Sequence, residues 1–128
     1  KGYAMATGIE NASGEIIVFI DANLSNLREE HFAQLITPVF NKEADLVLGQ
    51  ATDALIDCKM NPFKSFTGQR ALLKNDILPI LEDIKSSKLS VETLINLYYQ
   101  ALEKRVKYVM LANLKHTTKS DKLNNHSL

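Results

Sequence analysis

The order of predicted elements indicates an α/β domain with a mixed or parallel sheet flanked by helices, because helical and extended segments alternate along the chain. The apolar run at residues 15–20 is short, β-branched and bounded by Gly14 and Asp21, which is typical of a strand covered on both faces. With 128 residues and 45% hydrophobic composition, the chain is long enough for one domain with a core of ordinary size.

The first third of the chain predicts a helix, a strand and a second helix. Apolar side chains recur at helical spacing over residues 1–12. We expect the strand at 15–20 to be buried and parallel to its neighbours. After a polar loop at 21–26, residues 27–40 carry apolar side chains on a helical period, and Pro38 should kink or shorten the end of this helix.

The remainder predicts two more strands and two more helices. Pro79 falls in the first turn of one helix, where its missing N–H is tolerated, and Ser90 is placed to cap the other. The segments are strands at 44–51 and 106–111, an extended or turning segment at 66–73, and helices at 76–84 and 91–104. Three strands make a thin sheet, so we expect part of the sheet to lie outside this chain.

Composition excludes several classes of protein. Fifteen basic and fifteen acidic residues give a net charge of zero, which removes the bulk electrostatic argument for binding nucleic acid or an anionic membrane. The single Cys58 excludes an internal disulfide framework and a cysteine-based zinc site, and it favours a reducing compartment, so we expect a cytoplasmic protein. The longest apolar runs are far shorter than the roughly 20 residues of a membrane helix, which predicts a soluble chain without a membrane segment.

Asp21 and Asn23 follow the predicted buried strand at the point where open α/β sheets bind ligands. Both side chains can lean toward one hard cation such as Mg²⁺ or Mn²⁺, although Asp and Asn are also ordinary turn residues. His116 follows the last predicted strand and could reach the same cation if that strand lies near the first; otherwise it is a solvated loop residue. His31 and His126 lack this argument and are predicted to be surface residues.

Two further groups could carry chemistry. Gly68 allows a close backbone approach to a ligand, and Arg70 offers a planar fork for phosphate or carboxylate; the alternative is a turn with a surface arginine. Glu92 lies in the first turn of the last long helix, where it either interacts with the helix dipole or acts as a general base toward an acceptor hydroxyl. The aromatic side chains, Tyr108 among them, have helix or strand spacing and are predicted to be core residues.

Several of these segments match the motif order of a known family. Residues 12–24 (ASGEIIVFIDANL) resemble the segment that leads into the Asp-x-Asp motif of family 2 glycosyltransferases, which have the GT-A fold. Residues 44–49 are similar to the next strand of that family, and residues 66–71 (FTGQRA) to its Ser-Gly-x-Arg segment. The later segments, 91–94 and 106–111 with His116, are similar to the branch that includes glucosyl-phosphoglycerate and mannosylglycerate synthases.

The resemblance implies a metal-assisted transfer of a sugar from a nucleotide-diphospho-sugar donor to a hydroxyl of a small-molecule or glycan acceptor. It implies a divalent Mg or Mn cofactor. Carried over residue by residue, it assigns Glu92 as the catalytic acidic residue near the acceptor, Asp21, Gly68 and Arg70 to nucleotide or donor binding, and Asp21, Asn23 and His116 to the metal.

The chain departs from the family pattern in two respects. Asn23 replaces the usual Asp, and an amide oxygen is a poorer ligand for a hard dication than a carboxylate. The amino-terminal half of the catalytic domain is missing, so residues 1–119 are expected to be its carboxyl-side portion, inactive alone, with a polar tail at 120–128. An exposed sheet edge would also allow a homo-oligomer. Two alternatives stay open: a degenerate transferase-like binding module without catalysis, and a nucleotidyltransferase.

Overall fold

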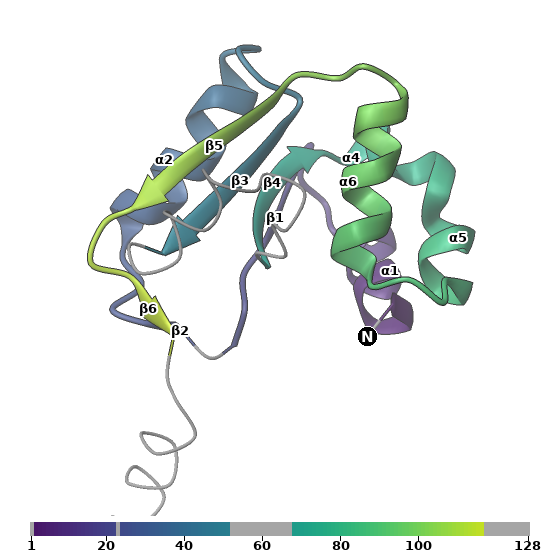
Figure 1. The fold of residues 1–128 in the computed structure, drawn as a ribbon, viewed down its shortest axis with the longest axis horizontal. Helices are drawn as coiled ribbons and strands as arrows, with labels where there is room; N and C mark the ends of the chain where they lie inside the picture. Colours follow the sequence, from purple (N-terminus) through teal and green to yellow (C-terminus); the bar gives the residue numbers. More distant parts are fainter. Residues whose placement is uncertain (1, 23, 52–67, 117–128) are drawn as a thin grey trace, which may run out of the picture.

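The computed structural model describes residues 2–22, 24–51 and 68–116 (Figure 1). Helices and strands alternate along this part of the chain. In order, the elements are α1 (Gly2–Asn11), β1 (Ile16–Phe19), β2 (Leu24–Ser25), α2 (Glu29–Phe40), β3 (Leu46–Ala51), β4 (Gln69–Leu73), α4 (Lys74–Ile77), the 3₁₀ helix η2 (Leu78–Ile80), α5 (Leu81–Ser86), α6 (Val91–Ala101), β5 (Val106–Leu111) and β6 (Lys115–His116).

The main sheet has four strands in the order β1-β4-β3-β5, and β2 and β6 form a separate two-stranded sheet. β4 runs antiparallel to both β1 and β3, whereas β5 runs parallel to β3. The prediction of an α/β domain with a mixed sheet is therefore confirmed. The prediction of a parallel, fully covered first strand is wrong for the described sheet. Among the described strands, β1 lies at the edge of the sheet and pairs only with β4, which is antiparallel to it, and only Ile17 of the four β1 residues is buried.

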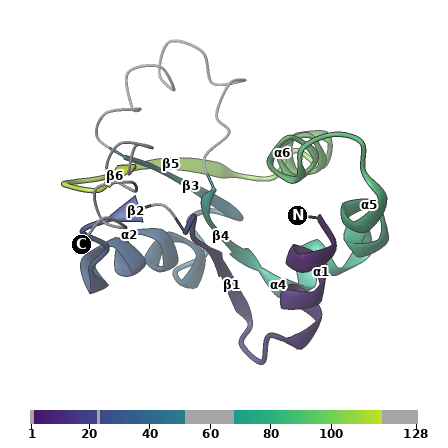
Figure 2. The ribbon, with the colours of Figure 1, turned by 90° about the horizontal axis from the view of Figure 1, so that it is seen from below.

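Helices cover both faces of the main sheet. Figure 2 shows α2 on one side and α1, α5 and α6 on the other. Successive residues of a strand point to opposite faces, so Leu46 and Leu48 of β3 pack with the α1–α5–α6 core, whereas Val47 packs with Leu35 of α2. The main sheet therefore separates two hydrophobic cores, one on each face.

Local chemistry sets the helix boundaries. The Ser90 side chain accepts a hydrogen bond from the Thr93 N–H at 3.1 Å, which confirms the predicted cap of α6. The predicted helix at 76–84 is divided into α4, η2 and α5, because Pro79 has no N–H for a continuous helical ladder. Pro38 lies inside α2, which ends two residues later at Phe40.

Some expectations fall on residues that the structure does not describe: Asn23, Cys58, His126 and the tail at 120–128. None of the helices in residues 2–22, 24–51 and 68–116 has both the length and the apolar character that a membrane-spanning helix requires.

Candidate active site

Arg70 lies at the centre of the candidate site. It occupies the middle of the sheet on β4, opposite Phe19 of β1 and Leu48 of β3, and its side chain is fully buried at 0% exposure. Its guanidinium donates a hydrogen bond from Nη1 to Oδ1 of Asn96 on α6 at 2.6 Å. The alternative of a surface arginine on a turn is therefore wrong, because Arg70 links the sheet to α6.

Three further side chains interact electrostatically with the Arg70 guanidinium. Burial lowers the pKa of Arg70 to about 10, while Glu92, Tyr108 and Asp21 act in the opposite direction. Glu92 is itself only 6% exposed. We call these residues the Arg70 cluster: Asp21 after β1, Arg70 on β4, Glu92 and Asn96 on α6, and Tyr108 on β5.

Gly68 lets Asp21 approach this cluster. A Cβ atom on Gly68 would overlap the Asp21 carboxylate, so a side chain at this position would displace it. The Asp21 backbone N–H donates to Oε1 of Gln69 at 3.1 Å, which fixes the chain as it leaves β1. No described glycine has a positive φ, so Gly68 is needed for space rather than for an unusual backbone conformation.

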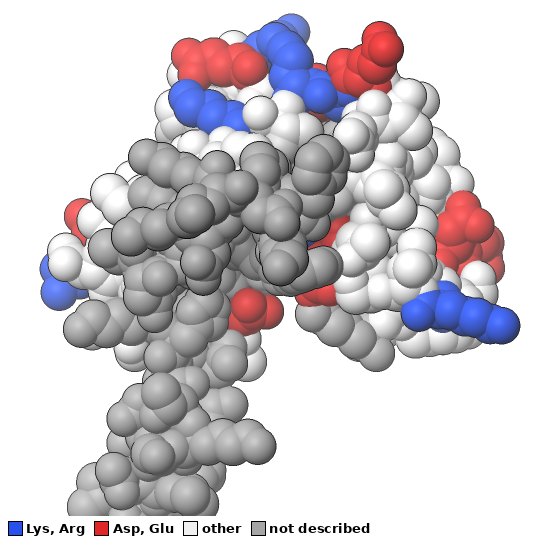
Figure 3. Space-filling view, in the orientation of Figure 1, with Lys and Arg blue, Asp and Glu red and all other residues white. Residues whose placement is uncertain are grey.

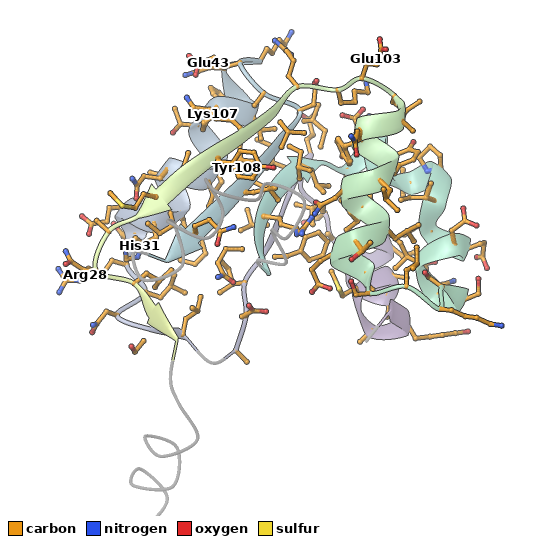
Figure 4. All side chains as sticks on the ribbon, viewed as in Figure 1. Arg28, His31, Glu43, Glu103, Lys107 and Tyr108 are labelled. Carbon is orange, nitrogen blue, oxygen red and sulfur yellow. The ribbon has the colours of Figure 1, made fainter. Side chains whose placement is uncertain are left out.

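Four of the residues assigned by the family resemblance are thus brought together: Asp21, Gly68, Arg70 and Glu92. Sequence reasoning missed Asn96 and Tyr108. Asn96 could have been found as a polar residue one helical turn after Glu92, within the otherwise apolar sequence of residues 94–99. Tyr108 was expected in the core but is 41% exposed, and Figure 4 shows its side chain pointing from β5 toward the middle of the molecule.

A cleft of about 440 Å³ opens beside the Arg70 cluster, between α6 and strands β3 and β5. Asn96 and Tyr108 belong to the Arg70 cluster and also line the cleft. Leu97 and Val106 add apolar surface to the cleft. Figure 3 shows few charged side chains over α6, whereas basic and acidic side chains gather at the end of the molecule that carries the turn before β5. A cleft of this size and mixed lining suits a small-molecule ligand.

The backbone places His116 beside β2. β5 and β1 lie at opposite edges of the main sheet, so the last long strand is not beside the first. Instead, β6 pairs with β2 and places His116 opposite Leu24, the residue after Asn23. Within the described ranges, no group of three or more His, Cys, Asp or Glu side chains is placed to hold a metal ion. The metal set Asp21, Asn23 and His116 stays a prediction.

His31 differs from expectation. It was predicted to lie on the surface, but it is 1% exposed, because its ring is enclosed between α2 and the turn that follows β5. Figure 4 shows it at the β5–β6 end of α2.

Comparison with solved structures identifies the fold, whereas no protein-family model and no curated protein matches the sequence. Glucosyl-3-phosphoglycerate synthase from Mycobacterium tuberculosis, in complex with Mn²⁺, UDP-glucose and phosphoglyceric acid, is 21% identical with a TM-score of 0.63. That match covers 96% of this chain and 49% of the synthase. The same enzyme with Mg²⁺ and UDP gives 20% identity, a TM-score of 0.64 and the same coverage.

The chain has a partial GT-A fold. A crystal structure of a further mycobacterial protein also matches, with 18% identity, a TM-score of 0.66, and coverage of 93% of this chain and 44% of that protein. The chain spans about half the length of these solved structures. The GT-A architecture expected from the sequence motifs is therefore confirmed.

Proposed function

We propose that the chain is the acceptor-side and metal-side part of a glycosyltransferase that moves a sugar from a nucleotide-diphospho-sugar to an acceptor hydroxyl. The observation that carries this proposal is the meeting of Asp21, Gly68 and Glu92 around buried Arg70, although these residues are far apart in sequence. The solved structures that share the fold hold UDP-glucose with Mn²⁺, and UDP with Mg²⁺. A GT-A fold alone would not decide the chemistry.

Each residue has a role in this proposal. Glu92, in the first turn of α6, accepts the proton of the acceptor hydroxyl as it attacks the anomeric carbon. Asp21 contacts the ribose or the metal, and Gly68 lines the donor side. Because the Arg70 guanidinium is fully buried, Arg70 supports the donor site from behind rather than by contacting the diphosphate.

The three residues of the predicted metal set have side chains that suit a hard cation. The Asp21 carboxylate, the Asn23 amide oxygen and the His116 imidazole would hold Mg²⁺ or Mn²⁺, which accept oxygen ligands and share them with phosphates. The pairing of His116 with Leu24, the residue that follows Asn23 in the sequence, supports the inclusion of His116 in this set. When bound, the cation would supply positive charge to the leaving diphosphate.

Calorimetric titration of UDP into the full-length protein, with and without Mn²⁺, tests the proposal. We expect UDP binding to require Mn²⁺. The affinity for UDP in the presence of Mn²⁺ should fall at least tenfold in Asp21→Asn and rise in Asn23→Asp, because a carboxylate is the better ligand for a hard cation. Glu92→Gln is the matched control and should retain UDP binding but lose transfer. Binding without transfer in both the wild type and Asn23→Asp would favour a binding module, and turnover of nucleoside triphosphates would favour a nucleotidyltransferase.

A further inference from the structure

We propose that His31 is a positioning residue: it ties the turn between β5 and β6 to the start of α2 and so keeps β6, with His116, paired beside the predicted cation site. The link to the cation rests on the proposed function. The tie itself rests on contacts of described residues alone.

Both ring nitrogens of His31 are used. Nδ1 accepts a hydrogen bond from the Arg28 backbone N–H at 3.0 Å, and Nε2 lies 2.7 Å from the Ala112 carbonyl oxygen. Since Nδ1 is the acceptor, the proton is on Nε2, which donates to Ala112. The side chain is 1% exposed, so water does not compete for either bond.

A histidine at this helical position performs two tasks that a glutamate cannot combine. The third residue of a helix is often Glu or Gln, whose side chain reaches back to the N–H of the capping residue. His31 makes this bond to Arg28 through one nitrogen and keeps a donor on the opposite side of the ring for Ala112. A glutamate could cap the helix, but its carboxylate could not donate to a carbonyl.

The ribbon that His31 holds has little support of its own. β2 and β6 contribute two residues each, and an isolated two-stranded ribbon is marginally stable at best in water. Only two residues, Asn113 and Leu114, lie between Ala112 and Lys115 at the start of β6, so fixing the Ala112 carbonyl limits where β6 can lie. Leu114, fully buried against the α2 core, is the second anchor of this turn.

A nearby bond provides a matched control. Gln34, one turn further along α2, donates from Nε2 to the Met110 carbonyl oxygen at 3.2 Å and is exposed. It joins the same helix to the end of β5 but does not reach the turn that carries β6.

The experiment compares His31→Glu, His31→Gln and Gln34→Ala in the full-length protein. Amide hydrogen–deuterium exchange is followed for residues 112–116, and UDP binding is titrated against Mn²⁺. In His31→Glu, which retains the cap but lacks the donor, we expect exchange at 112–116 to rise at least tenfold. We also expect the Mn²⁺ midpoint to rise about 10- to 100-fold, the effect typical of losing a group that orients a metal ligand, because β6 carries His116. His31→Gln, which retains a donor, and Gln34→Ala should stay within about threefold of wild type in both readouts.

Unchanged exchange at 112–116 and an unchanged Mn²⁺ midpoint in His31→Glu would overturn the inference. If His31→Glu does not fold, histidine-labelled wild-type protein decides instead: a slowly exchanging Nε2 proton on His31 supports the tie, and its absence refutes it. If wild type binds no UDP at any Mn²⁺ concentration, the proposed function fails, while the exchange data still test the tie.

Discussion

Replacing Arg70 by Met tests whether the Arg70 cluster holds α6 against the sheet by charge and hydrogen bonding. Met fills much of the same volume but removes the guanidinium, which leaves buried Glu92 without its counter-charge and Asn96 Oδ1 without its donor. Removing one member of a buried charge pair costs about 3–5 kcal/mol, within which a hydrogen bond to a charged group accounts for about 1.5–3 kcal/mol. This is a large share of the roughly 5–15 kcal/mol that stabilises a typical domain.

Urea unfolding of three variants separates this effect from simple loss of packing. We expect Arg70→Met to lose about 3–5 kcal/mol of unfolding free energy and the double variant Arg70→Met/Glu92→Gln to lose less than the sum of its single changes by at least about 1 kcal/mol. Arg105→Met is the control, because Arg105 is 59% exposed in its ion pair with Asp45 and should lose less than about 1 kcal/mol. A loss in Arg70→Met as small as that of the control, or strict additivity in the double variant, would refute the reasoning.

Two further predictions concern Asp45 and Gly68. Burial acts to raise the pKa of Asp45, but hydrogen bonds from the Arg105 backbone and side chain and the positive charges of Arg105 and Lys104 outweigh it, so the pKa lies below the usual 3.8. The contribution of Asp45 to stability is therefore present above pH 3.8 and lost as the pH falls below it. Asp45→Asn should lower the free energy of unfolding by about 0.5–1 kcal/mol at pH 7, and the difference from wild type should vanish in acid unfolding curves. A difference in unfolding free energy that stays constant with pH would contradict this. Gly68→Ala should displace the Asp21 carboxylate and lower the free energy of unfolding by about 1–3 kcal/mol. Gly8→Ala is the control: a Cβ there meets nothing within 4 Å, so this variant should be neutral or stabilising in thermal unfolding. Equal effects of the two changes would exclude the close contact between Gly68 and Asp21.

Local rules identified most elements of this fold from the sequence. The side-chain oxygen of Ser90 and the apolar stripe after it are short-range signals, so α6 was predicted with its cap. The direction of β1 was not predicted correctly, because a β-branched apolar run suits either a parallel or an antiparallel neighbour. The pairing of β1 with β4 joins residues more than fifty positions apart. β2 and β6 are two residues each and carry no periodic pattern that a sequence could show.

The sequence indicated Gly68 and three members of the Arg70 cluster, but neither the other two members nor the geometry of the cluster. The family motifs indicated Asp21, Gly68, Arg70 and Glu92, and the structure brings them together. That Arg70 is buried could not be read from its neighbours, since its burial depends on α6 and β5 from later in the chain. His31 was misjudged for the same reason: an acidic, polar helix start indicates exposure, and the turn that covers it lies eighty residues away.

Sugar transfer by the full-length protein tests the central claim most directly. The measurement is release of nucleoside diphosphate from a panel of nucleotide sugars in the presence of Mn²⁺ and candidate acceptors. We expect release of nucleoside diphosphate from at least one nucleotide sugar. This release should require both Mn²⁺ and an acceptor, and it should be lost in Glu92→Gln although UDP still binds. Release that persists undiminished in Glu92→Gln, or no release from any donor by a protein that binds UDP, would contradict it.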